Sequence, residues 1–189
     1  MKRLILCIAL LTTVGCAPKT PVNTPTPSKI GQTAVIGRQF VVAGTGAVRG
    51  LDTVMSSGML PVEYGVPVLK VLHEIGEQAV RLADILRAID EARTAAERTD
   101  AIGRARAAIV GMRSLLEGAA LPIADSKAKS VVIATLSTLS AVLQDFGDTL
   151  ASLIAEDLSP QPNLVASADA LTEIPYTWAT SPLLLTGRR

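Results

Sequence analysis

Apolar residues recur at steps of three and four along four stretches of the chain, roughly residues 32–57, 67–97, 100–117 and 126–157. This spacing places the apolar side chains of each stretch on one face of an α-helix. The narrowest stripe belongs to the fourth stretch and consists of Leu136, Leu139, Leu143, Phe146, Leu150 and Leu153. A stripe this narrow packs against other helices at small crossing angles. The pattern therefore predicts an all-α protein, an antiparallel bundle of about four helices.

Turn-forming and capping residues separate the four predicted helices. Gly58 and Pro61 follow the first, and Pro67 fits the first turn of the second, where a missing N–H is harmless. Thr99 or Asp100 has the side-chain oxygen needed to cap the third helix. We expect the fourth helix to begin at Asp125 or Ser126, by the same capping chemistry.

The first sixteen residues have the order of a secretory signal. Lys2 and Arg3 are basic, residues 4–11 are apolar, and small residues lead to Cys16. The apolar run of eight residues is too short to span a bilayer, which takes about 20. The sequence predicts that this segment is an export signal.

The stretch Thr13-Val14-Gly15-Cys16 resembles the lipobox of bacterial prolipoproteins, although Thr13 stands where leucine is usual. The resemblance implies that the Cys16 thiol receives a diacylglycerol, that residues 1–15 are removed, and that the new amino terminus is acylated. Ala17 replaces the aspartate associated with inner-membrane retention. This implies the outer membrane, facing the periplasm, in a Gram-negative host. The alternatives are an ordinary cleaved signal, or an apolar helix with a chance cysteine.

The residues after the signal divide by composition into three parts. Residues 16–30 hold the lipidated cysteine and a Pro/Thr tether, whose prolines favour an extended chain rising about 3.1 Å per residue. Residues 31–158 form the helical bundle domain. Residues 159–189 are an irregular tail that is extended, partly packed along the bundle or disordered. In that tail, Trp178 and Leu183 to Leu185 could dock on an apolar groove or equally contact a partner.

Charge and composition argue against nucleic acid as a partner. The chain has a formal net charge of +1, and without Lys2 and Arg3 it retains 16 basic and 17 acidic residues, a net of −1. Such balance gives no attraction to a polyanion. The fourth stretch contains an uncharged run at 130–143, but five of its residues are Ser or Thr. Its length favours a core helix over a membrane span.

Three fragments match catalytic or cofactor motifs incompletely. Residues 40–50 resemble a dinucleotide-binding glycine loop with its third glycine misplaced, and they read better as small residues on a closely packed helix. His73 begins a zinc-protease pattern, but Glu77 stands where the second histidine belongs. Ser126 and Lys129 satisfy the S-x-x-K pattern without its companion elements. We therefore predict no catalytic, cofactor-binding or metal-binding residue and no cofactor.

Charges of alternating sign cluster from residue 81 to residue 106. They are Arg81, Asp84, Arg87, Asp90, Glu91, Arg93, Glu97, Arg98, Arg104 and Arg106. The simplest interpretation is a solvent-exposed surface with pairs three and four residues apart. The same charges could instead set the register of a partner.

The function predicted from these features is that of a lipid-anchored envelope lipoprotein, not an enzyme. It would be attached to the membrane through Cys16 and act as a protein-interaction or structural module with a protein partner in the envelope. One alternative is a carrier of an apolar ligand or lipid between Ala/Gly-rich helices. Others are a surface exclusion lipoprotein encoded by a phage or plasmid, and a hydrolase using Ser126 and Lys129.

Overall fold

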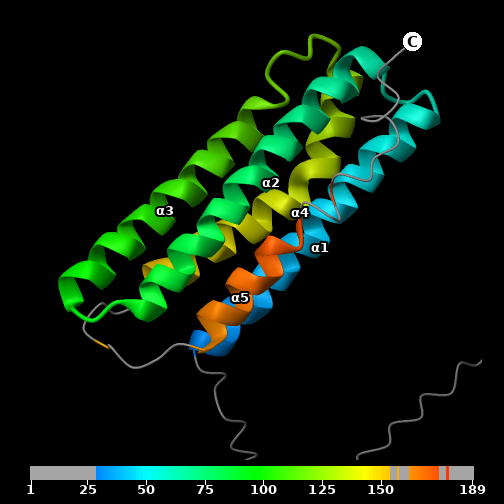
Figure 1. Cartoon of the computed structure of the whole chain (residues 1–189). Coiled ribbons are helices and arrows are strands. Elements are labelled where there is room, and N and C mark those ends of the chain that lie inside the picture. Colours follow the sequence, from blue (N-terminus) through cyan, green and yellow to red (C-terminus); the bar gives the residue numbers. More distant parts are fainter. Residues whose placement is uncertain (1–28, 154–156, 158–161, 175–177, 179–189) are drawn as a thin grey trace, which may run out of the picture.

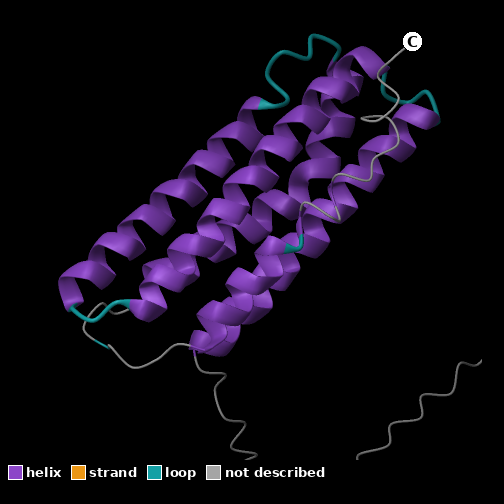
Figure 2. Ribbon diagram, in the orientation of Figure 1, coloured by secondary structure: helices purple, strands orange, loops and turns teal. Residues whose placement is uncertain are grey.

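The computed structural model of the chain describes residues 29–153, 157, 162–174 and 178. These residues form five helices and no strand (Figures 1 and 2). The helices are α1 (Lys29–Ser56), α2 (Val62–Glu91), α3 (Ala95–Gly118), α4 (Ser126–Ala151) and α5 (Pro162–Thr172). The predicted all-α class is confirmed. The predicted signal, Cys16 and most of the tether lie outside the described residues.

The helices lie side by side along one long direction of the molecule (Figure 1). In cross-section, α1 packs against α4, α4 against α3, and α3 against α2, while α5 packs against both α1 and α2. The α1–α2 and α3–α4 loops lie at one end of the molecule, and the α2–α3 loop lies at the other end with the start of α1 (Figure 2). One continuous apolar core extends through all five helices.

The connection between α1 and α2 depends on Gly58. Its φ of +74° is in the left-handed region, which glycine occupies without steric cost. The Gly58 N–H donates to the carbonyl of Met55, and this bond terminates α1 just after Ser56. Helix α2 begins earlier than predicted, at Val62 after Pro61, so Pro67 lies inside α2 and not in its first turn.

A capping box at Thr94 and Glu97 separates α2 from α3. The Thr94 hydroxyl accepts from the Glu97 N–H at 3.2 Å, and the Glu97 carboxylate accepts from the N–H groups of Arg93 at 2.8 Å and Thr94 at 3.2 Å. The predicted break at Thr99 or Asp100 is therefore wrong. Both residues lie within α3, where the Thr99 hydroxyl donates to the Ala95 carbonyl. Two reciprocal bonds stabilise the earlier start better than a single cap does.

The same capping box lowers the pKa of Glu97. The backbone N–H groups of Arg93 and Thr94 both donate to the ionised carboxylate, with Arg93 contributing most. Hydrogen bonds that favour the charged form of an acid depress its pKa. The negative charge also lies in the first turn of α3, where it complements the helix dipole.

Helix α4 begins at the predicted place and ends earlier than predicted. Asp125 is the cap, since its carboxylate accepts from the Ala128 N–H at 2.6 Å. The helix ends at Ala151, not near residue 157. At that end, Nη2 of Arg106 on α3 donates to the carbonyl of Ala151 at 2.9 Å. Such a cation satisfies carbonyls that have no partner within their own helix.

Helix α5 corrects the prediction that residues 159–189 are irregular throughout. Pro162 is its first residue, a position that tolerates proline. Leu164, Ala168 and Leu171, spaced by four and three, are fully buried against the rest of the molecule. The helix approaches α1 closely at Gly37, where an added Cβ would lie 3.0 Å from Cβ of Ser167. Periodicity does not predict this helix, because its apolar stripe has only three positions within a proline-punctuated segment.

One helix of the described residues, α4, is long and apolar enough to cross a membrane, judged by length and composition alone. Core helices of soluble proteins pass the same test. The stripe of α4 contributes Leu139, Leu143 and Phe146 to the buried core, and Val132 on the same helix is also buried.

Candidate functional site

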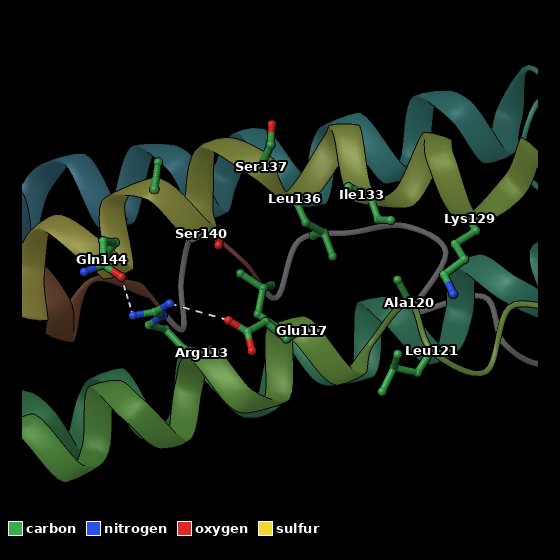
Figure 3. Close-up of a pocket in the computed structure, with 12 residues that line it drawn as sticks. Arg113, Glu117, Ala120, Leu121, Lys129, Ile133, Leu136, Ser137, Ser140 and Gln144 are labelled. Atoms are coloured by element: carbon green, nitrogen blue, oxygen red, sulfur yellow. Dashed lines mark hydrogen bonds and ion pairs between the residues drawn. The ribbon is translucent and has the colours of Figure 1, made fainter. Parts of the chain in front are cut away.

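A groove about 590 Å³ in volume lies between the second half of α3 and the part of α4 from Lys129 to Gln144 (Figure 3). Leu116 and Leu136 form its floor and belong to the protein core. Leu121, in the α3–α4 loop, and Ile133, on α4, line its solvent-exposed side and are 72% and 53% exposed. Small-molecule sites occupy about 300–1,000 Å³ and are mostly apolar. The groove has the size and lining of such a site.

Polar side chains close one end of the groove. Arg113 on α3 donates from Nη1 to the side-chain oxygen of Gln144 on α4, and its Nη2 lies 3.5 Å from the Glu117 carboxylate (Figure 3). Gln144 in turn donates to Asp148 at 3.0 Å. The Nε of Arg113 is buried and has no hydrogen-bond partner among the residues that the structure describes. This cluster joins α3 to α4 and ends the apolar part of the groove.

Lys129 marks the other end of the groove. It lies in the first turn of α4 and lines the groove opposite Ala120 (Figure 3). Within the described part of the chain it forms no ion pair. The nearest acidic residue in sequence, Asp125, is already engaged in capping α4 through Ala128. The partial positive charge of a helix amino terminus adds to that of the lysine. This end of the groove can therefore receive an anion.

The glycine-loop fragment at 40–50 lies entirely within α1, so it does not form the loop of a dinucleotide site. Gly44 faces Trp178, and an added Cβ there would lie 1.6 Å from Cζ2 of the indole. Gly50 faces Thr135 on α4, with 2.9 Å to its methyl group, whereas Gly46 faces open space. The interpretation as a closely packed helix is therefore right for Gly50 and wrong for Gly46.

Trp178 docks on the helices of this chain, which is the first of the two alternatives given above for this residue. It is 3% exposed, and its indole N–H donates to the Val41 carbonyl at 3.4 Å. Its ring centroid lies 5.6 Å from that of Phe40. On α2, an added Cβ at Gly76 would lie 3.1 Å from the same indole. Leu183 to Leu185 lie outside the described residues.

The zinc-protease fragment is an exposed pair of side chains. Nε2 of His73 lies 3.5 Å from the Glu77 carboxylate, and both side chains are more than half exposed. No group of three or more His, Cys, Asp or Glu side chains that could hold a metal occurs in the residues the structure describes.

Ser126 and Lys129, the S-x-x-K pair, lie on the first turn of α4. Ser126 is exposed, and its carbonyl accepts from the Ser130 hydroxyl. Asp125, not Ser126, caps the helix. Of the two residues of the pair, only Lys129 lines the groove.

The charged residues from 81 to 106 do not all form the solvent-exposed surface with local pairs that the sequence predicts. Arg104 pairs with Asp100 at 2.9 Å, as the pattern predicts. Arg87, however, reaches across to Asp169 on α5 at 3.0 Å. Arg98 is only 2% exposed and donates to the Asp157 carbonyl, which follows α4 in sequence. The prediction is therefore wrong for Arg98. A buried charge of this kind needs its partners, because removing it from water is costly.

The groove was missed at the sequence level. Leu121 lies in a loop, and Ile133 falls outside the apolar stripe of α4, so neither belongs to a helical pattern. The sequence feature that could have indicated the groove is the presence of two large apolar residues, Leu121 and Ile133, outside the apolar stripe of α4.

No family model, curated protein or solved structure matches this chain.

Proposed function

We propose that this chain is a lipid-anchored envelope protein whose helical bundle acts as a protein-interaction or structural module without catalysis. The observation that carries the proposal is the order of basic residues, apolar run, Cys16 and Pro/Thr tether at the amino terminus. The start of α1 at Lys29, directly after the last Pro/Thr residues, supports a division into anchor, tether and folded part. A cysteine carrying several acyl chains binds a membrane stably, whereas a single myristoyl chain binds only marginally.

The finer architecture proposed is an antiparallel bundle of α1 to α4, with α5 added on the α1–α2 side. Loops of three to seven residues between these helices support it, because short connections favour antiparallel neighbours. The resemblance at Cys16 and Ala17 further implies the outer membrane, facing the periplasm.

An interaction role is supported by the end of the bundle that lies away from the start of α1. Met59 and Val62 in and after the α1–α2 loop are both more than half exposed. Helix α1 has 28 residues, so at 1.5 Å per residue it holds this end about 42 Å from the tether. We propose that the partner is an envelope protein and not a nucleic acid, because the charge balance offers no attraction for a polyanion.

The anchor is tested by a matched pair of cysteine substitutions, Cys16→Ser and Cys7→Ser. The chain has two cysteines, and both lie in the amino-terminal segment. We expect Cys16→Ser to abolish signal cleavage and membrane attachment. We expect Cys7→Ser to leave both unchanged, since that residue belongs to the discarded signal. Membrane fractionation and the intact mass of the mature amino terminus are the measurements. Normal processing and attachment of the Cys16→Ser protein would refute the anchor.

The interaction role is tested by a photo-crosslinking amino acid placed in intact envelopes at Val62 or at Val110. Both valines are exposed, but Val62 begins α2 beside the α1–α2 loop and Val110 lies within α3. We expect a discrete protein adduct from position 62 and none from position 110. Adducts from neither position, or the same adducts from both, would count against an interaction at this end.

A further inference from the structure

We propose that the groove between α3 and α4 binds a single-chain anionic amphiphile, a long-chain carboxylate, with its acyl chain in the groove and its carboxylate at Lys129. This site is separate from the proposed anchor at Cys16 and does not depend on lipidation. Three features carry the inference: the shape of the apolar floor, the length of the groove, and the unequal charge at its two ends.

The floor of the groove fits an acyl chain better than a peptide helix. Leu116 on α3 and Leu136 on α4 line the groove and are each only 4% exposed, so they form its floor. Adjacent packed helices are about 8–10 Å apart, and a helix with its side chains is about 10–12 Å wide. A helix backbone therefore stays outside such a groove, whereas a linear hydrocarbon enters it. Leu121 and Ile133 would lose much of their exposed apolar surface when the chain binds.

The groove has a limited length. Lys129 and Gln144 mark its two ends on α4, and fifteen residues of helix span about 22 Å. At the Gln144 end, Arg113 is hydrogen-bonded to Gln144 and forms an ion pair with Glu117, which lies further along the groove toward Lys129 (Figure 3). A hydrocarbon that starts at Lys129 would therefore end against this cluster. The site selects for one chain of restricted length and not for the two chains of a phospholipid.

The head of the ligand is assigned from the charges. Arg113 is already balanced by Glu117 at the closed end of the groove. Lys129 has no ion pair among the described residues, and it lies at the positive end of the α4 dipole. A carboxylate there would accept a charge-assisted hydrogen bond from the ammonium group. A cationic head of the same size would be repelled.

The experiment uses the full chain carrying Cys16→Ser, purified without detergent, and isothermal titration with dodecanoate below its micellar concentration. Dodecylammonium tests the sign of the head, and hexanoate tests the need for a long chain. The lysine variants are Lys129→Glu and, as the control, Lys127→Glu, which is exposed on the same turn and does not line the groove.

A second pair of variants tests the apolar part. Leu121→Asp puts a charge beside the proposed chain, and Val110→Asp puts one at an exposed position of α3 outside the groove. Both replaced side chains are largely exposed, so neither variant should unfold the protein. Circular dichroism of each variant verifies this.

We expect dodecanoate to bind at one site, and dodecylammonium and hexanoate to bind at least about tenfold more weakly. Lys129→Glu and Leu121→Asp should each weaken dodecanoate at least about tenfold, and the two controls should stay within about twofold of the parent. Absence of dodecanoate binding overturns the proposal, as do equal effects of the two lysine variants or equal affinity for dodecylammonium. Because Cys16 is replaced throughout, failure of the anchor hypothesis would leave this titration unchanged.

Discussion

Replacing Gly44 by alanine would force the indole of Trp178 out of its place between α1 and α2. The new Cβ would lie 1.6 Å from Cζ2, 2.3 Å from Cε2 and 2.4 Å from Cη2 of the ring. These separations are far below van der Waals contact, and the atoms belong to a rigid ring. The ring also has little room to shift, because Phe40 and Gly76 lie against it.

The cost of losing this contact follows from the burial of Trp178, which is 3% exposed. A tryptophan buries about 150–250 Å², and at about 25 cal/mol per Å² this is worth about 4–6 kcal/mol as an upper estimate. Alanine in place of glycine inside a helix returns about 1 kcal/mol. We expect Gly44→Ala to lower the free energy of unfolding by about 3–5 kcal/mol, which is also the range for removing a buried tryptophan side chain.

Gly46→Ala is the matched control on the same helix. An added Cβ at Gly46 meets nothing within 4 Å, so only the helix propensity acts and the protein should gain up to about 1 kcal/mol. The assay is urea unfolding followed by far-ultraviolet circular dichroism. The chain has one tryptophan, so its fluorescence emission independently reports whether the indole has become exposed to water.

A double variant isolates the cause of the effect. In a Trp178→Ala background the indole is absent, so Gly44→Ala should no longer destabilise the protein. Equal destabilisation of both backgrounds by Gly44→Ala would show that contact with the indole is not the cause. A Gly44→Ala variant with the stability and the emission spectrum of the parent would contradict the close contact itself.

The capping box and the core supply the remaining predictions. Thr94→Ala should cost about 1 kcal/mol in urea unfolding, whereas Thr99→Ala, inside α3, should cost nothing; equal losses would contradict the assignment of the cap. Carboxyl NMR titration should show the pKa of Glu97 below its ordinary value. The stability that Glu97 contributes should be complete above the pKa of the unfolded chain and should fall as the pH drops through the folded pKa. An unshifted or raised value would refute the hydrogen bonds drawn to this carboxylate. Phe146→Ala, at a fully buried position of α4, should cost about 3–5 kcal/mol, and a loss below 1 kcal/mol would contradict its burial.

Periodicity predicted α1 and the body of α4 well because their apolar residues form long stripes against the core. It failed between α2 and α3, where the Glu, Arg and Ala residues from 91 to 98 have good helix propensity and neither Gly nor Pro interrupts the sequence. The signal was present in the sequence, since Thr94 precedes Glu97 by three residues, the spacing of a capping box. Capping chemistry should therefore take precedence over periodicity in polar stretches.

The candidate site depended on contacts that no local pattern contains. Arg113 and Gln144 are 31 residues apart in sequence, and their pairing follows only from how α3 lies on α4. The space beside Gly44 that the Trp178 indole occupies could not be predicted from a local pattern either. Glycine within a helix is ordinarily unfavourable, and Trp178 comes much later in the chain. The sequence could identify the small residues, but it could not identify the ring that they accommodate.

The position of Trp178 also has a consequence for synthesis of the protein. Its indole bonds to Val41, 137 residues earlier in the chain, and a ribosome adding about 5–20 residues per second takes about 7–27 s to make that interval. Until then, the sides of α1 and α2 that α5 and Trp178 will cover stay exposed to solvent. A stop codon at position 162 would leave α1 to α4 intact in sequence and would keep that apolar surface permanently open. Loss of α5 and Trp178 would therefore uncover part of the apolar core, as a polar substitution within the core would disturb it.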